Sequence, residues 1–215
     1  MGMKLYHGSK LKIEKPLCHG SKIYNDYGPA FYLTKDLESA KCWACRNNSI
    51  GYVNVYEFDD KNLKVLDLTD SSKYSVLNWI AILLDNRELP NKFINQFSNR
   101  IKFIKDNYYV DVNEYDVVIG YRADDAYFRF PLDFIVSNIT LEQLEASFKL
   151  GNLGTQIVVI SEKGINRLKF VKSILSEEDY IDKYYQSVND ATKRYDDLPK
   201  DADGTRIMDL IRDKL

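Results

Sequence analysis

Hydrophobic and polar residues alternate along several short stretches of the chain. Residues 52–58 alternate with a period of two, and residues 63–68 form a second short apolar run. This spacing is typical of strands with one buried face, and the short separation predicts that the two strands are antiparallel neighbours. Further short apolar runs predict strands at residues 4–6, 30–34, 115–121 and 155–161, with an edge strand at 168–174.

Between and after these strands, apolar residues recur at helical spacing. Residues 71–86 and 91–106 form two amphipathic segments separated by Pro90, and they are expected to pack together as an insertion. Asp36 is a plausible N-cap for a helix over 37–47. Helices are also expected at 140–150 and 177–195, with a polar linker at 196–205 and a short amphipathic helix at the C-terminus.

Short strands with helices inserted between them predict an α+β fold. Residues 1–195 are expected to form one domain that includes the helical insertion at about 71–106, followed by the linker and terminal helix of 196–215. The chain is too short for several large domains but long enough for one sizeable core. The insertion is too small to fold as a separate domain.

The composition excludes several classes of protein. Hydrophobic residues make up 45% of the chain and charged residues 29%, and no apolar run approaches the length of a membrane span. The formal net charge of -2 argues against general binding to polyanions. The start of the chain lacks an apolar signal region, and three cysteines do not make a disulfide framework. We therefore expect a cytoplasmic protein with no membrane association.

Cys42 and Cys45 form a C-x-x-C pair, which suggests metal or redox chemistry. The pair falls inside an expected helix, and no second pair follows at the spacing of a zinc site. Cys18 and His19 complete four ligands on paper. Buried cysteines that pack as small hydrophobic residues are the favoured interpretation, so no metal is expected.

Three polar side chains stand out by their positions. His7 ends the first expected strand, Tyr32 lies in the second, and Gln156 begins a later buried strand. Each has a simple structural alternative: a hydrogen-bonded histidine at a strand end, a core tyrosine, and a glutamine with no particular role. Asp124 and Asp125 follow another strand, where acidic residues more often form a turn or an N-cap.

The segments around these residues resemble a known family. "LYHGS" and "FYLTKDLESAKCWA" are similar to the first two signature segments of ADP-ribosyltransferases of the poly(ADP-ribose)-polymerase-like, diphtheria-toxin-like branch. "YDVVIGYRADD" and "LGNLGTQIVVISEK" extend the similarity to a bacterial family of uncharacterised domains assigned to that superfamily. Together the segments cover residues 5 to about 170. The resemblance implies a split, mixed β-sheet and NAD as a substrate.

The resemblance also implies roles for individual residues. His7 would hydrogen-bond the adenine-side ribose, the Gly8 backbone would pair with the nicotinamide carboxamide, and the Tyr32 ring would stack on nicotinamide. Gly8 lacks a Cβ, so a ligand is expected to lie close against the strand. Ser9 would bind a ribose hydroxyl, and Ser39 would contact nicotinamide.

Gln156 departs from the pattern of the wider ADP-ribosyltransferase branch, which has a glutamate at this position. Members of the resembling bacterial family carry glutamine here, so we interpret it as a variant of the mechanism. Glutamine keeps a carbonyl acceptor but carries no charge, so stabilisation of a cationic transition state would be weaker. The expected activity is single transfer rather than polymer formation, unless a second carboxylate helps. Asp124 and Asp125 are the candidates for that carboxylate. Replacing Gln156 by glutamate is expected to preserve or raise NAD hydrolysis.

Three classes of function remain open. The first is an NAD-dependent mono-ADP-ribosyltransferase that modifies a protein or nucleic acid. The second is a module that binds NAD or ADP-ribose without turnover, and the third is an interaction protein. The RNA 2′-phosphotransferase branch of the superfamily ranks below these, because the motif segments supply no second histidine. A toxin–antitoxin-like arrangement, with a small inhibitory partner protein, is a further expectation from the resemblance.

Overall fold

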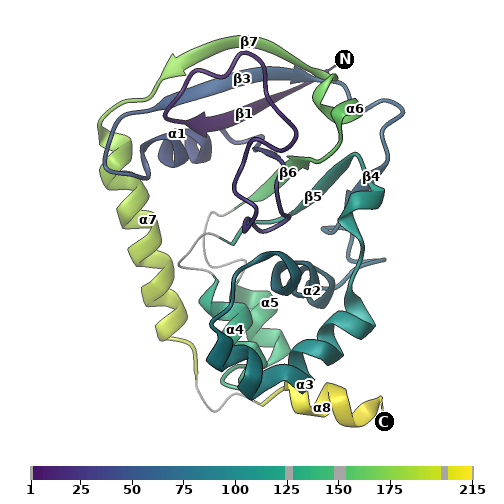
Figure 1. Ribbon diagram of the computed structural model, residues 1–215. Coiled ribbons are helices and arrows are strands. Elements are labelled where there is room, and N and C mark those ends of the chain that lie inside the picture. The colour runs from purple at the N-terminus through teal and green to yellow at the C-terminus, as the bar shows by residue number, and fades with distance from the viewer. Residues whose placement is uncertain (1, 124–127, 148–153, 200–202, 215) are drawn as a thin grey trace.

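The computed structural model describes residues 2–123, 128–147, 154–199 and 203–214. Strands in these ranges form two sheets, seen in the upper half of Figure 1. The first sheet has the order β1-β3-β7, with bounds Met3–Ser9, Tyr52–Phe58 and Leu168–Leu175. The second has the order β2-β6-β5-β4, with bounds Phe31–Leu33, Thr155–Val159, Val117–Tyr121 and Val65–Asp67.

The two sheets meet at one isolated bridge between Tyr6 of β1 and Thr34, just after β2. Each residue donates its backbone N–H to the carbonyl of the other, with N···O distances of 2.9 Å. Beyond this bridge the two strands pair with different sheets. The junction therefore lies beside His7, which follows Tyr6 directly.

The expected antiparallel pairing of residues 52–58 with 63–68 is wrong. β3 pairs with β1 and β7, whereas β4 lies in the other sheet and pairs in parallel with β5. A parallel pair needs a long crossover connection, and here α2 (Val76–Asn86) and α3 (Asn91–Tyr108) supply it between β4 and β5. The short loop between β3 and β4 connects two sheets and does not close a hairpin.

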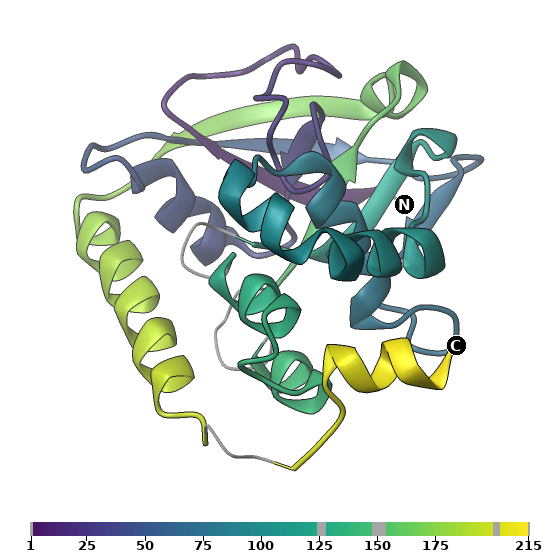
Figure 2. The ribbon, with the colours of Figure 1, turned by 60° about the horizontal axis from the view of Figure 1, so that its bottom comes forward.

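The remaining helices surround the sheets. Asp36 caps α1 (Leu37–Cys45) as expected, because its side chain accepts hydrogen bonds from the amides of Glu38 and Ser39. The other helical elements are η1 (Val112–Glu114), α4 (Arg129–Ile135), α5 (Leu141–Ser147), α6 (Glu162–Ile165), α7 (Asp179–Asp196) and α8 (Ile207–Asp213). Figure 2 shows α7 along one flank of the molecule and α8 beside the lower helices.

Three hydrophobic clusters hold these elements together. The largest joins α2 to one face of the second sheet and extends through α4 and α5 to Ile207 of α8. A second fills the space between the two sheets, and a third packs α1 on β1 and β3. The helical insertion thus shares its core with the sheet. The architecture is α+β with a mixed second sheet, and none of the described helices is both long and apolar enough to span a bilayer.

Candidate functional site

His7 lies at the junction of the two sheets and is fixed by β2. Its Nδ1 is 2.6 Å from the Tyr32 carbonyl oxygen, and its ring stacks on Phe31 with a centroid separation of 4.5 Å. A carbonyl only accepts, so Nδ1 must carry the proton, which leaves Nε2 as an acceptor. Burial lowers the pKa of His7 to about 4, against the effect of the Tyr32 bond. The imidazole is therefore neutral at physiological pH.

The missing side chain of Gly8 allows α1 to pack closely on β1. A Cβ placed on Gly8 would lie 2.2 Å from the Ala40 carbonyl oxygen and 2.7 Å from the Ala44 amide nitrogen. The helix therefore fills the space that a side chain would need. Only the edge of the Gly8 peptide remains for a ligand.

That peptide edge points toward β2. Backbone groups of alternate strand residues point to the same side, so the Gly8 N–H and C=O point as those of Tyr6 do, toward β2. Continuing the register of the bridge places Tyr32 opposite Gly8, but the Tyr32 carbonyl accepts from the His7 ring instead. Within the described ranges no backbone partner bonds Gly8 on this side. Because the His7 ring takes the Tyr32 carbonyl, the Gly8 N–H and C=O have no backbone partner on this side among the described residues.

The Tyr32 side chain is held by the loop that precedes β2. Its hydroxyl donates to the Gly28 carbonyl at 2.6 Å and accepts from the Tyr27 amide at 3.1 Å. Burial raises the pKa of Tyr32 well above its usual value, so the phenol stays protonated. The hydroxyl both donates and accepts, and the residue is partly buried against the largest cluster, so the ring is the part of Tyr32 that could contact a ligand.

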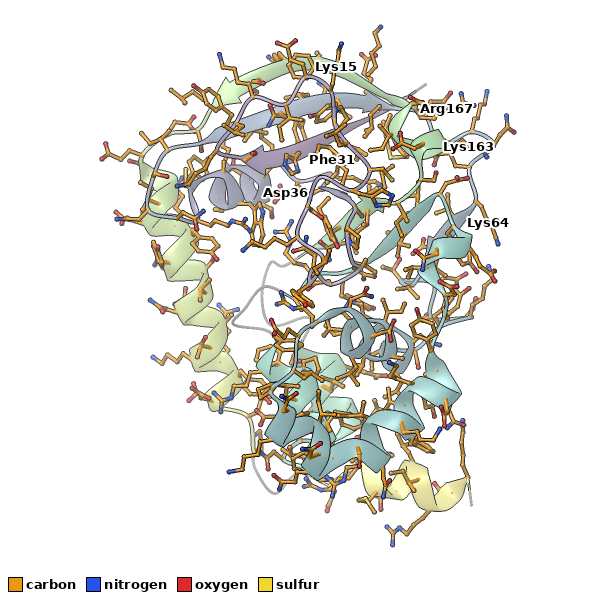
Figure 3. The ribbon with its side chains drawn as sticks, in the orientation of Figure 1. Lys15, Phe31, Asp36, Lys64, Lys163 and Arg167 are labelled. Carbon is orange, nitrogen blue, oxygen red and sulfur yellow. The ribbon has the colours of Figure 1, made fainter. Side chains whose placement is uncertain are left out.

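The two serines are both partly engaged. The Ser39 hydroxyl donates to the N-cap carboxylate of Asp36 at 2.5 Å, which leaves its lone pairs as acceptors. Burial raises the pKa of Asp36, but hydrogen bonds from Ser39 and Glu38 outweigh it and give a net lowering. Ser9 accepts from the Leu11 amide at 3.2 Å and keeps its hydroxyl proton. Figure 3 labels Asp36 at the start of α1 and Phe31 beneath β1.

Gln156 is buried at the start of β6, with 4% of its surface exposed. Its Nε2 donates to the Tyr121 carbonyl at 2.9 Å and to Asp26 Oδ2 at 3.1 Å. No group in the described part of the chain donates to its Oε1. Opposite Gln156, β5 has Gly120, where a Cβ would lie 2.0 Å from the Tyr27 hydroxyl oxygen, so glycine is needed there.

The strand register relates the three expected site residues. Tyr32 pairs with Val158, two residues after Gln156, so Tyr32 and Gln156 project from the same face of the second sheet. One further step places Gln156 across from Thr34, the residue bridged to Tyr6. The His7 ring, from the first sheet, stacks on Phe31, whose side chain projects from the opposite face of the second sheet into the cluster between the sheets. The structure therefore gathers the three residues around the sheet junction, with His7 and Tyr32 in direct contact.

The residues beside Gln156 include one that the sequence analysis missed. Asp26 lies in the loop before β2 and is separated from Gln156 by 130 positions in the sequence. Its setting, Asn-Asp-Tyr-Gly-Pro, reads as an ordinary turn, so no local pattern marks it. Asp124 and Asp125 lie outside the described residues.

The cysteines do not cluster with other ligands. The Cys18 thiol donates to the Ile160 carbonyl, and Cys45 approaches the Glu177 carbonyl at 3.8 Å. Across the described ranges no group of three histidine, cysteine or acidic side chains is placed to hold a metal ion.

Basic side chains remote from the junction are paired with acids. Lys64, Lys163 and Arg167, labelled in Figure 3, lie within 4.0 Å of Glu114, Asp116 and Asp59, respectively. Exposed pairs of this kind contribute little to stability.

Comparison with known proteins gives one match. The family model described as "Protein of unknown function (DUF3990)" matches residues 3–170. No curated protein and no solved structure matches the chain. The matched range begins with β1 and ends within β7, so it contains every site residue described above. The chain therefore belongs to the DUF3990 family of proteins of unknown function.

Proposed function

We propose that the protein is an NAD-dependent mono-ADP-ribosyltransferase acting on a cellular macromolecule. The observation that carries the proposal is the Gly8 peptide: its N–H and C=O point toward β2, where the Tyr32 carbonyl accepts from the His7 ring instead. One donor beside one acceptor matches a primary carboxamide, the polar group of nicotinamide. The motif segments that resemble ADP-ribosyltransferases supply these same residues.

The groups around Gly8 fit the rest of the dinucleotide. The His7 Nε2 lone pair can accept a ribose hydroxyl, and the Tyr32 ring offers a stacking face. The guanidinium groups of Arg46 and Arg122 lie 4.3 and 5.1 Å from the ring centroid of Trp43, whose Cβ is close to Gly8. Positive charges at this position suit a diphosphate.

The proposed reaction breaks the bond between C1′ of the ribose and the nicotinamide nitrogen. Nicotinamide leaves with the electron pair, and the developing cation is attacked at C1′ by an acceptor nucleophile, which loses its proton. Gln156 Oε1 accepts no hydrogen bond from the described residues, so it is available for the ribose 2′-hydroxyl. The chain's contribution is to bend and orient the dinucleotide around the junction.

A binding module without turnover is the second candidate. The amide at position 156 favours it, because glutamine brings less electrostatic stabilisation to a cation than glutamate does. A small inhibitory partner stays a prediction from the resemblance.

Two labelled forms of NAD distinguish the candidates. With the label on the adenine side, a transferase should pass it to protein or nucleic acid and release one nicotinamide per transfer. With the label on nicotinamide, no macromolecule should become labelled. Saturable binding without nicotinamide release would support the binding module. Absence of both binding and release would contradict the proposed function.

A further inference from the structure

A buried carboxylate lies directly behind Gln156. Only 6% of the surface of Asp26 is exposed. Its Oδ2 accepts from the Ala123 amide at 2.8 Å and from Gln156 Nε2 at 3.1 Å, and its Oδ1 lies 3.5 Å from Arg87 Nε. Together these contacts connect the loop before β2 to β6 and to the segments that follow β5 and α2.

Keeping a charge at this position has a cost. Burial raises the pKa of Asp26, and the Ala123 amide, Arg87, Gln156 and Arg122 only oppose that rise. When folding raises the pKa of a carboxyl group, the free energy of unfolding falls as pH rises above the pKa that the same group has in the unfolded chain. The two hydrogen bonds accepted by Oδ2 and the guanidinium beside Oδ1 are contacts that favour the carboxylate form against this cost. Perturbed carboxylates of this kind are concentrated at functional sites.

The contacts of Asp26 also decide which way the Gln156 amide points. Both groups that contact its outer end, the Tyr121 carbonyl and the Asp26 carboxylate, are acceptors. The amide nitrogen must therefore occupy that position, and Oε1 must take the other. Without the Asp26 carboxylate, only the Tyr121 carbonyl would favour this orientation of the amide.

We propose that Asp26 is the positioning residue for Gln156, and that its carboxylate supplies, through the amide, the negative charge that glutamine lacks. The effect on turnover rests on the proposed function. The structural half of the inference, which is the coupling between Asp26 and the side chain at position 156, can be tested without NAD. In the described part of the chain, the titratable groups near Asp26 are the side chains of Arg87, Arg122, Tyr27 and Tyr32. Burial raises the pKa of each of these two tyrosines, so neither adds charge at neutral pH.

Two substitutions of Asp26 separate its two effects. Asp26→Asn can place an amide oxygen where Oδ2 lies and keep both accepted hydrogen bonds, while it removes the charge and turns an amide NH2 group toward Arg87. We expect NAD affinity to change less than about threefold and kcat for nicotinamide release to fall roughly ten- to a hundredfold. Asp26→Ala also frees the Gln156 amide and should lower kcat at least as far. Asp60→Asn, at an exposed position, is the matched control.

The structural half is tested by Gln156→Glu in two backgrounds. Beside an intact Asp26 the new carboxylate faces a second carboxylate and the Tyr121 carbonyl, so its pKa should rise. Stability should then fall as pH rises, and we expect the Tm at pH 8 to drop by roughly 5–10 °C relative to the unsubstituted chain, with a smaller drop at pH 5. In the Asp26→Asn background the same change should cost less and depend less on pH.

The outcomes distinguish this inference from the proposed function. Equal Tm losses for Gln156→Glu in both backgrounds would overturn the coupling between the two residues, whatever the activity. If the coupling is found and the unsubstituted protein releases no nicotinamide, the proposed function fails and the structural half stands. If nicotinamide is released and Asp26→Asn retains full kcat, the role of the charge is overturned.

Discussion

At the scale of single residues, the lowered pKa of His7 makes a prediction about stability at acid pH. Its folded pKa of about 4 lies below the ordinary value of 6.5, so the unfolded chain binds a proton first as pH falls. His7 should therefore lower stability as pH decreases from about 6.5 to about 4. His7→Asn keeps a donor for the Tyr32 carbonyl but does not titrate. We expect the Tm of this variant to fall less over that pH range than that of the unsubstituted chain.

A steeper or equal acid loss in His7→Asn would contradict the neutral, Nδ1-protonated imidazole. The same variant loses the Nε2 acceptor. Calorimetry should show NAD affinity reduced by about five- to tenfold, as expected for one neutral hydrogen bond of about 1 kcal/mol.

Gln156→Ala tests the contact made in the transition state. Removing the amide takes away the free Oε1 but leaves His7, Gly8 and Tyr32 in place. We expect NAD binding to be largely retained and the rate of transfer to fall roughly ten- to a thousandfold, because the lost interaction strengthens as charge develops. Nicotinamide release measures the rate and calorimetry the binding. Full transfer by this variant would remove Gln156 from the mechanism.

The structure changes the expectation for glutamate at position 156. From the sequence, Gln156→Glu should preserve or raise NAD hydrolysis. With Asp26 Oδ2 3.1 Å from Nε2, the substitution instead brings two carboxylates together. We now expect that change to raise hydrolysis only where Asp26 is also neutralised.

At the scale of elements, the packing of α1 on β1 depends on Gly8. A methyl group there meets backbone atoms of the helix, which cannot move aside as a flexible side chain can. We expect Gly8→Ala to lower the free energy of unfolding by about 1–3 kcal/mol, measured by urea denaturation. Gly20→Ala is the control, because its nearest contact is a side-chain carbon at 3.3 Å. Equal stabilities of the two variants would show that α1 adjusts without cost.

The sequence predicts elements better than it predicts their neighbours. The Asp36 cap and the alternation in residues 52–58 are local signals, and α1 and β3 lie where these signals indicate. The partner of β4 is β5, which follows two helices later in the sequence. The short loop between residues 58 and 63 therefore led to a wrong prediction of the pairing. Asp26 was missed for the same reason, since its contact with Gln156 exists only after the sheets have assembled.

At the scale of the whole molecule, the segment after residue 170 connects distant parts. Glu177, just before α7, forms an ion pair with Lys41 of α1 at 3.0 Å, and the Tyr180 hydroxyl of α7 donates to Glu38 of α1 at 2.6 Å. α8 reaches the largest cluster through Ile207. This segment lies beyond residues 3–170, which the family model matches, yet it packs against α1 and against the largest hydrophobic cluster.

Ile207 gives a measure of that contribution. The side chain is fully buried, whereas its neighbour Met208 is 42% exposed. We expect Ile207→Ala to lower the free energy of unfolding by about 2–5 kcal/mol and Met208→Ala by less than about 1 kcal/mol. Urea denaturation of both variants provides the comparison. A loss of less than about 1 kcal/mol for Ile207→Ala would mean that α8 contributes little to the core.

The position of β7 at the outer side of its sheet has a consequence for self-association. No described strand pairs with its free side, and Val171 and Leu175 are 45% and 57% exposed. An uncovered strand edge with apolar neighbours invites another chain to add a strand, and charged lysines are a common protection against this. Lys169 and Lys172 are both exposed on β7. Two side chains outside the candidate site therefore help to keep separate copies of this chain from aggregating edge to edge.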